Sequence, residues 1–140
     1  FDTLQYMNTN LLTQLIEQSP YPLNYGTKIV HAEGDIECVT QWRDIFTGNP
    51  LLRAWHGGVV SGVLELTGTL AAIKASNSQE CGLLSINTVY LRPTRGDNEM
   101  FSKANVVRSG KHIQTINAVA WQNSFEEPTA IASLTFVSKW

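Results

Sequence analysis

A single carboxylate interrupts a long apolar stretch in the middle of the chain. Between Gly57 and Ile73, Glu65 is the only charged side chain. A buried carboxylate without a partner is costly, so such a group usually has a chemical task or a dedicated partner. Two interpretations stay open: Glu65 lies on the one solvated line of a helix, or it acts in catalysis.

The tripeptide His56-Gly57-Gly58 comes shortly before this carboxylate, at the predicted start of the same helix. Glycines at a helix N-terminus leave backbone N–H groups unshielded, and the helix dipole favours negative charge there. A carbonyl oxygen that gains charge during acyl transfer would be stabilised at that point. The alternative is that the glycines only supply the dihedral angles of a tight turn into the helix.

The spacing of these groups limits how they can act together. Gly58 and Glu65 are seven residues apart, which is two helical turns, or roughly 10 Å along the axis. One chain therefore cannot bring both groups to the same carbon atom. Two antiparallel copies of the helix would place the N-terminus of one beside the carboxylate of the other. The spacing predicts an active site between two copies of the chain and an inactive monomer.

Length and composition set limits on the class of protein. We predict a single domain over residues 1–140, with 16% charged residues against roughly 25% in an average domain, so a partner is expected to cover part of the surface. The net charge of −2 offers no basic excess for nucleic acid or an anionic membrane.

The apolar run around Glu65 is expected to be too short and too interrupted to span a bilayer. Cys38 and Cys81 are isolated, which is typical of a reduced cytoplasmic protein, and the three histidines lack zinc-ligand spacing, so no metal is expected.

The hydrophobic periodicity predicts an α+β fold. Apolar residues at three- and four-residue steps indicate an N-terminal helix over residues 3–18, which Pro20 ends. A second helix, over residues 58–75, is apolar nearly all round and should be buried. Because the last four predicted strands are joined by short connections, we expect them to be consecutive antiparallel neighbours in one curved sheet around that helix. The predicted strands are residues 27–32, 35–42, 82–91, 99–108, 112–122 and 129–138.

Several motifs of this sequence resemble one family. The run Gly48-Asn49-Pro50, then His56-Gly57-Gly58-Val59-Val60 and Glu65, is similar to the PaaI-type branch of the hotdog-fold acyl-CoA thioesterases, in the 4-hydroxybenzoyl-CoA thioesterase-like superfamily. Val89-Tyr90-Leu91-Arg92-Pro93 and residues 106–111 (VVRSGK) also resemble that family, and the similarity runs over roughly residues 24–138. The resemblance implies a curved antiparallel sheet wrapped around one central helix, and a homodimer or homotetramer. It also implies hydrolysis of acyl-CoA thioesters, with coenzyme A as part of the substrate and no other cofactor.

The resemblance also assigns roles to individual residues. The Gly58 amide at the helix start would polarise the thioester carbonyl. Glu65 of the neighbouring subunit would be the general base for water or the nucleophile. His56, with Gly57 in the same loop, would orient the loop or donate a hydrogen bond near the thioester.

Residues outside this motif are assigned to substrate binding by the same resemblance. The family pattern places an asparagine six residues before the histidine; here Pro50 stands at that position and Asn49 falls one residue early. Thr69 lies one turn beyond Glu65, where its hydroxyl can form a hydrogen bond near the carboxylate or simply pack in the helix. The turns after two strands carry basic residues that would form a rim for the coenzyme A phosphates, and solubilising surface charge is the alternative for each. These residues are Arg92, Arg95, Arg108 and Lys111.

Other functions remain as alternatives at this point. A hotdog dehydratase acting on 3-hydroxyacyl thioesters would need a His–Asp/Glu pair, for which His56 is the nearest candidate. A non-catalytic protein that binds acyl-CoA or lipid is favoured by the displaced Asn49. An unrelated α+β fold of the cystatin or nuclear-transport-factor type ranks lowest, because such folds place their helices before the sheet.

Overall fold

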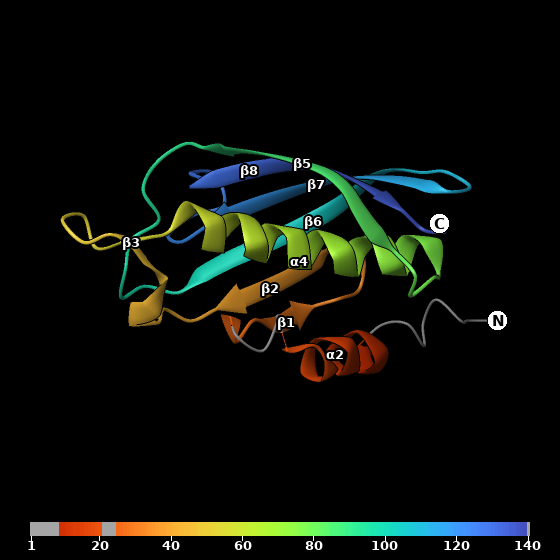
Figure 1. Ribbon diagram of the computed structural model, residues 1–140, viewed down its shortest axis with the longest axis horizontal. Helices are drawn as coiled ribbons and strands as arrows, with labels where there is room; N and C mark the ends of the chain where they lie inside the picture. The colour runs from red at the N-terminus through yellow and green to blue at the C-terminus, as the bar shows by residue number, and fades with distance from the viewer. Residues whose placement is uncertain (1–8, 21–24, 140) are drawn as a thin grey trace.

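One long helix, α4 (Gly57–Ser76), lies along one face of a six-stranded antiparallel sheet (Figure 1). The computed structural model describes residues 9–20 and 25–139. The predicted N-terminal helix is present from Thr9 on, and its first six residues lie outside the described part. The other elements, in chain order, are α2 (Thr9–Gln18), β1 (Lys28–His31), β2 (Ile36–Thr40), the 3-10 helix η1 (Asp44–Phe46), β3 (Thr47–Asn49), β4 (Ala54–Trp55), β5 (Gly82–Tyr90), β6 (Met100–Ser109), β7 (Ile113–Trp121) and β8 (Ala130–Val137).

The strand order in the large sheet is β1-β2-β6-β7-β8-β5. The predicted pairing of β6 with β7 and of β7 with β8 is confirmed, but the predicted pairing of β5 with β6 is wrong. Strand β6 already has β2 on one side and β7 on the other, so β5 pairs with the open edge of β8 instead. The connection over residues 91–99 can reach about 30 Å when extended, whereas three strand spacings need only about 14 Å.

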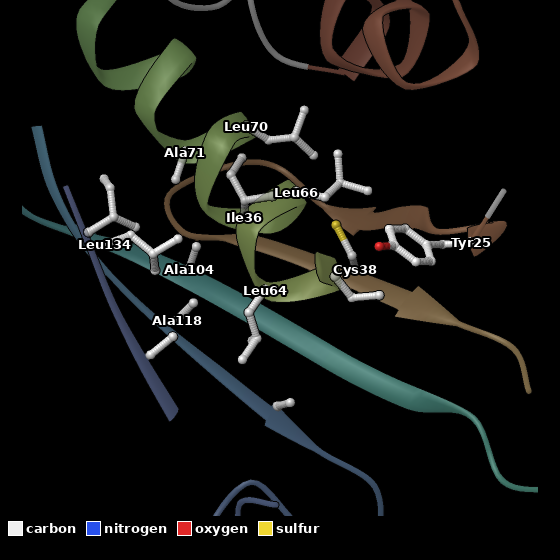
Figure 2. Close-up of a cluster of buried hydrophobic side chains, with 14 of the residues drawn as sticks. Tyr25, Ile36, Cys38, Leu64, Leu66, Leu70, Ala71, Ala104, Ala118 and Leu134 are labelled. Atoms are coloured by element: carbon white, nitrogen blue, oxygen red, sulfur yellow. The ribbon is translucent and has the colours of Figure 1, made fainter. Parts of the chain in front are cut away.

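Small residues on the inner face of the sheet let α4 approach closely. Ala104, Ala118 and Ala132 are at most 5% exposed, and Figure 2 shows Ala104, Ala118 and Leu134 facing Leu64 and Ala71 of the helix. The buried hydroxyl of Thr67 is satisfied within this layer, since it bonds the hydroxyl of Ser102 at 2.8 Å and the carbonyl of Val63. The predicted hotdog architecture, a curved sheet around one buried helix, is confirmed.

One line of α4 remains partly accessible. Gly58, Ser61, Glu65 and Thr69 follow one another at three- and four-residue steps, and none of them is buried. By length and composition alone, α4 is long and apolar enough to cross a membrane, contrary to the expectation that this run is too short and too interrupted. Most of its side chains are buried inside the molecule, which is the arrangement of a core helix.

Candidate active site at the start of the central helix

His56 caps the N-terminus of α4 with its own side chain. Its backbone is extended, with φ −60° and ψ 135°, and its Nδ1 atom accepts a hydrogen bond from the Gly58 N–H at 2.8 Å. A ring nitrogen that accepts a hydrogen bond carries no proton, so the proton of the neutral ring lies on Nε2. The Gly58 amide is therefore engaged, which differs from the prediction that it is open to a substrate.

The adjacent amide is the one left open. Gly57 is the first residue of α4, and within the described part of the chain its N–H donates to no acceptor. An amide at this position also carries the positive end of the helix dipole. The open hydrogen-bond donor at the helix start is thus shifted by one residue from the prediction, from Gly58 to Gly57.

Strand β5 fixes this end of the helix from the side. The hydroxyl of Tyr90 donates to the carbonyl oxygen of Gly57 at 2.6 Å, and the hydroxyls of Thr88 and Ser61 lie 2.8 Å apart. A Cβ at position 57 would lie 3.1 Å from the Tyr90 ring. Glycine therefore leaves space for this tyrosine, which the sequence reasoning did not single out although it is part of the Val89–Pro93 motif.

Residues in and next to the β3–β4 hairpin contact the loop that contains His56. The His56 N–H donates to the carbonyl of Phe46 at 2.6 Å, and Trp55 is buried against the Phe46 ring with centroids 5.2 Å apart. A Cβ at Gly48 would lie only 2.5 Å from the Cα of His56. Glycine at position 48 is therefore required for the backbone of the loop to pass this closely, and the sequence reasoning did not assign it this role.

Glu65 lies two turns along the accessible line of α4. Burial raises the pKa of its carboxyl, and within the described residues its side chain has no hydrogen bond or ion pair that would offset this effect. The hydroxyl of Thr69 donates to the backbone carbonyl of Glu65 at 2.8 Å, so it serves the helix itself. A carboxyl whose pKa is raised by burial is a candidate general acid or base.

Asn49 has a local task at the tip of the hairpin. Its side-chain oxygen accepts a hydrogen bond from the Leu51 N–H at 3.0 Å, which closes the turn between β3 and β4. Arg53, with a positive φ of 47°, continues this turn and forms a salt bridge with Asp97 at 2.6 Å. The structure does not bring the Asn49 oxygen to the helix start as a free group.

An open cleft of about 380 Å³ adjoins the N-terminus of α4. Its walls include the apolar side chains of Leu52, Val60 and Leu91, together with Gly57 and the guanidinium-bearing Arg92. Arg92 also lines a second, more polar cleft with Arg95 and is 3.8 Å from Glu127. The structure thus brings Arg92 and Arg95 together near the helix start.

The other two basic residues lie at the opposite end of the sheet. Arg108 is near the last residue of β6 and Lys111 is in the following turn, whereas Arg95 precedes the first residue of β6. Ten strand residues separate these ends by about 30 Å. Within one chain the four residues therefore do not form a single rim. In residues 9–20 and 25–139, no group of three His, Cys, Asp or Glu side chains is placed to hold a metal ion.

Comparison with known proteins agrees with this architecture. The model of the thioesterase superfamily matches residues 53–128, and the chain therefore belongs to the thioesterase superfamily. The matched segment begins just before His56 and contains α4 with Glu65. No curated protein shows significant similarity to the chain.

Solved structures show the same fold at low sequence identity. PaaI of Escherichia coli, from the phenylacetic acid degradation operon, is 14% identical over 94% of this chain and 96% of its own, with a TM-score of 0.81. A thioesterase-related protein of Shewanella oneidensis is 20% identical over 93% and 94%, with a TM-score of 0.82. A phenylacetic acid degradation-related protein of Ralstonia eutropha is 20% identical over 90% and 98%, with a TM-score of 0.72. The predicted membership of the thioesterase superfamily and the predicted hotdog fold are confirmed.

Proposed function

We propose that this protein is an acyl-CoA thioesterase that hydrolyses an acyl- or aryl-CoA to the free acid and coenzyme A. One observation carries the proposal: a chain of the thioesterase superfamily presents an open amide at Gly57 and an unpartnered carboxylate at Glu65 along one helix. The first group suits a developing oxyanion, and the second suits proton transfer from water.

In this mechanism the Gly57 N–H donates to the thioester carbonyl oxygen. Water attacks the carbonyl carbon while Glu65 removes a proton from it, and the negative charge of the tetrahedral intermediate lies at the positive end of the helix dipole. The C–S bond then breaks, and the proton held by Glu65 passes to the departing thiolate. The alternative, with Glu65 as the nucleophile, would form an anhydride that water hydrolyses to the same products.

We infer that the two groups come from different copies of the chain. Gly57 and Glu65 are eight residues apart on α4, so they are separated by about 12 Å along one helix. The accessible line over Gly58, Ser61, Glu65 and Thr69 is where a second helix would have to approach. The proposal therefore includes a homodimer, or a homotetramer built from it, located in the cytoplasm, with the active site between subunits.

Basic residues would bind the coenzyme A part of the substrate. Arg92 and Arg95 lie near the start of α4 in the same polar cleft, where guanidinium groups can bind phosphate. Arg108 and Lys111 are too far away to join them within one chain. In the proposed assembly they would act only if a second copy brings them to this cleft.

One observation favours a second candidate function, a protein that binds acyl-CoA without turnover. The side-chain oxygen of Asn49 accepts a hydrogen bond within the hairpin turn and is not left free for a substrate.

The dehydratase alternative loses support, because Nδ1 of His56 accepts from Gly58 and the remaining Nε2 carries the proton. His56 in this state cannot act as the base of a dehydration.

The test is a screen of the purified protein against acyl-CoA substrates of different chain lengths and against aryl-CoA, with thiol release as the measurement. We expect hydrolysis of at least one substrate, and its loss in Glu65→Ala with an unchanged circular dichroism spectrum. Glu80→Ala, which removes an exposed carboxylate beyond the end of α4, is the matched control and should keep full activity.

Two results would overturn the proposal. Full activity of Glu65→Ala would remove the role given to this residue. Tight binding of a non-hydrolysable acyl-CoA thioether by the wild type, together with no hydrolysis of any thioester, would establish the binding protein instead.

A further inference from the structure

Tyr90 makes a contact that its surroundings do not require. The residue ends β5, and its side chain is 51% exposed, so burial of the ring does not hold it in place. Its hydroxyl nevertheless donates to the carbonyl oxygen of Gly57 at 2.6 Å, across 33 positions in the sequence. This bond joins the sheet edge to the first residue of α4.

The peptide unit between Gly57 and Gly58 is held on both sides. Its carbonyl oxygen accepts the hydrogen bond from Tyr90, and its N–H donates to Nδ1 of His56 at 2.8 Å. A hydrogen bond to the carbonyl of a peptide polarises the N–H of the same peptide, so the two bonds strengthen each other. Tyr90, this peptide and His56 thus form one continuous chain of hydrogen bonds.

This series of hydrogen bonds affects the groups on either side of the Gly57–Gly58 peptide. The bond to Nδ1 keeps the proton of the exposed His56 ring on Nε2, where it is a donor. A rotation of the Gly57–Gly58 peptide would therefore break the bond to Nδ1 and release the tautomer of the His56 ring. The open N–H of Gly57 belongs to the preceding peptide, whose carbonyl oxygen accepts from the N–H groups of Val59 and Val60 at 3.0 and 3.1 Å.

We propose that Tyr90 is a positioning residue of the active site, which holds the Gly57–Gly58 peptide in the orientation that sets the His56 tautomer and so keeps Nε2 of His56 a donor at the helix start. The inference rests on the proposed function for its effect on catalysis. Its structural part, the link from Tyr90 to the state of the His56 ring, stands without it.

A second contact between the same two elements provides a matched control. The hydroxyl of Thr88 bonds the hydroxyl of Ser61 at 2.8 Å, and it also joins β5 to α4, one turn further along the helix. Neither residue belongs to the hydrogen-bond chain of Tyr90. Thr88→Val removes this contact with little change in shape, as Tyr90→Phe removes the other.

The experiment compares wild type, Tyr90→Phe and Thr88→Val by steady-state kinetics and by ¹⁵N NMR of the histidine rings. The chain has only three histidines, and His56→Gln identifies the signals of His56 by their absence. In the wild type we expect an unprotonated Nδ1 and a protonated Nε2. In Tyr90→Phe we expect a mixed tautomer and a fall in kcat on the order of tenfold, with KM within about twofold. Thr88→Val should keep the wild-type spectrum and kcat.

Each remaining outcome overturns the inference. A wild-type His56 protonated on Nδ1 would exclude the hydrogen-bond chain, even if Tyr90→Phe failed to fold. An unchanged His56 spectrum in Tyr90→Phe would show that Tyr90 does not set the ring, and a changed spectrum with unchanged kcat would show that this setting has no role in the reaction. If the wild type hydrolyses no thioester, the proposed function fails, while the spectra still decide whether Tyr90 controls His56.

Discussion

The two ends of α4 differ in how their free backbone and charged groups are satisfied. At the C-terminal end, the Lys74 ammonium donates to the carbonyls of Ala32 and Gly34, and Asn77 ends the helix in the left-handed conformation at φ 55°. At the N-terminal end, the Gly57 amide has no acceptor among the described residues. Near its C-terminal end the helix is tied to the segment between β1 and β2, whereas its N-terminal end keeps a donor available.

The charged side chains of the helix follow the same division. Burial lowers the pKa of Lys74, while the nearby carboxylates of Asp35 and Glu33 act in the opposite direction. Burial raises the pKa of Glu65, and no described group acts against it. Lys74 therefore has partners that offset its burial, whereas Glu65 has none among the described residues. The comparison therefore favours the proposed active site along the line from Gly57 to Glu65 over one at the Lys74 end.

The largest effect is expected from removal of the open donor. Gly57→Pro removes the N–H and adds a ring, and proline is well tolerated at the first position of a helix after an extended residue such as His56. We expect kcat to fall by about 10²–10³, measured as thiol release from the best substrate. Gly57→Ala is the matched control, because it keeps the N–H and introduces the same Cβ near Tyr90. Equal losses in the two variants would show that the amide is not the donor.

A steric clash with the backbone of His56 should have the next largest effect. In Gly48→Ala, the new Cβ would lie 2.5 Å from the Cα of His56, so the backbone must move. We expect the free energy of unfolding to fall by about 3 kcal/mol and kcat to fall with it.

Gly34→Ala is the comparison variant near the Lys74 end of α4. A Cβ at position 34 has open space, but the φ of +76° is unfavourable for alanine. There we expect a loss of about 1 kcal/mol and an unchanged kcat for the folded protein. A reduced kcat in Gly34→Ala would contradict the division between the two ends.

Removal of the Lys74 ammonium should lower the stability of the protein and leave its activity unchanged. Lys74→Met keeps the length of the side chain and leaves the carbonyls of Ala32 and Gly34 without their donor. We expect the free energy of unfolding in urea to fall by about 2 kcal/mol, with kcat of the folded protein unchanged. Lys139→Met, at an exposed position after β8, serves as the control for the loss of one positive charge. A loss of activity without a loss of stability would give the Lys74 end a functional role that the structure does not indicate.

The sequence allowed the helix and most strands to be predicted, because their hydrophobic patterns are local. Residues 58–75 were predicted as a buried helix and are observed as Gly57–Ser76. The position of β5 could not be derived from the lengths of connections, since it depends on which strand edges β2 and β7 leave open. The same limit applies to the contact of Tyr90 with Gly57, which exists only because β5 ends beside α4.

The residues of the candidate site are proposed from their types and spacing, which do not show their hydrogen bonds. Serine, threonine, aspartate and asparagine are the usual side chains that cap a helix N-terminus, so the pattern gave no reason to expect His56 to accept from Gly58. The basic residues were grouped because each follows a strand, and the direction of β6 separates Arg95 from Arg108. Spacing along the chain indicates which residues share an element, whereas strand order decides which elements meet.

The smallest effect is a dependence of stability on pH that belongs to Glu65. Its pKa in the folded protein is raised above the ordinary value of 4.5, so the folded state holds this proton more tightly than the unfolded state. Well below pH 4.5 the carboxyl is neutral in both states and carries no cost. As the pH rises through the raised pKa, the folded protein must place a charge in a partly buried position, and its stability falls.

Glu65→Gln is neutral throughout, so its melting temperature should match that of the wild type near pH 4 and exceed it modestly at pH 7. Glu80→Gln controls for the loss of one negative charge at an exposed position. A wild type that gains stability relative to Glu65→Gln as the pH rises would mean that Glu65 has a partner after all, and the contrast with Lys74 would not hold.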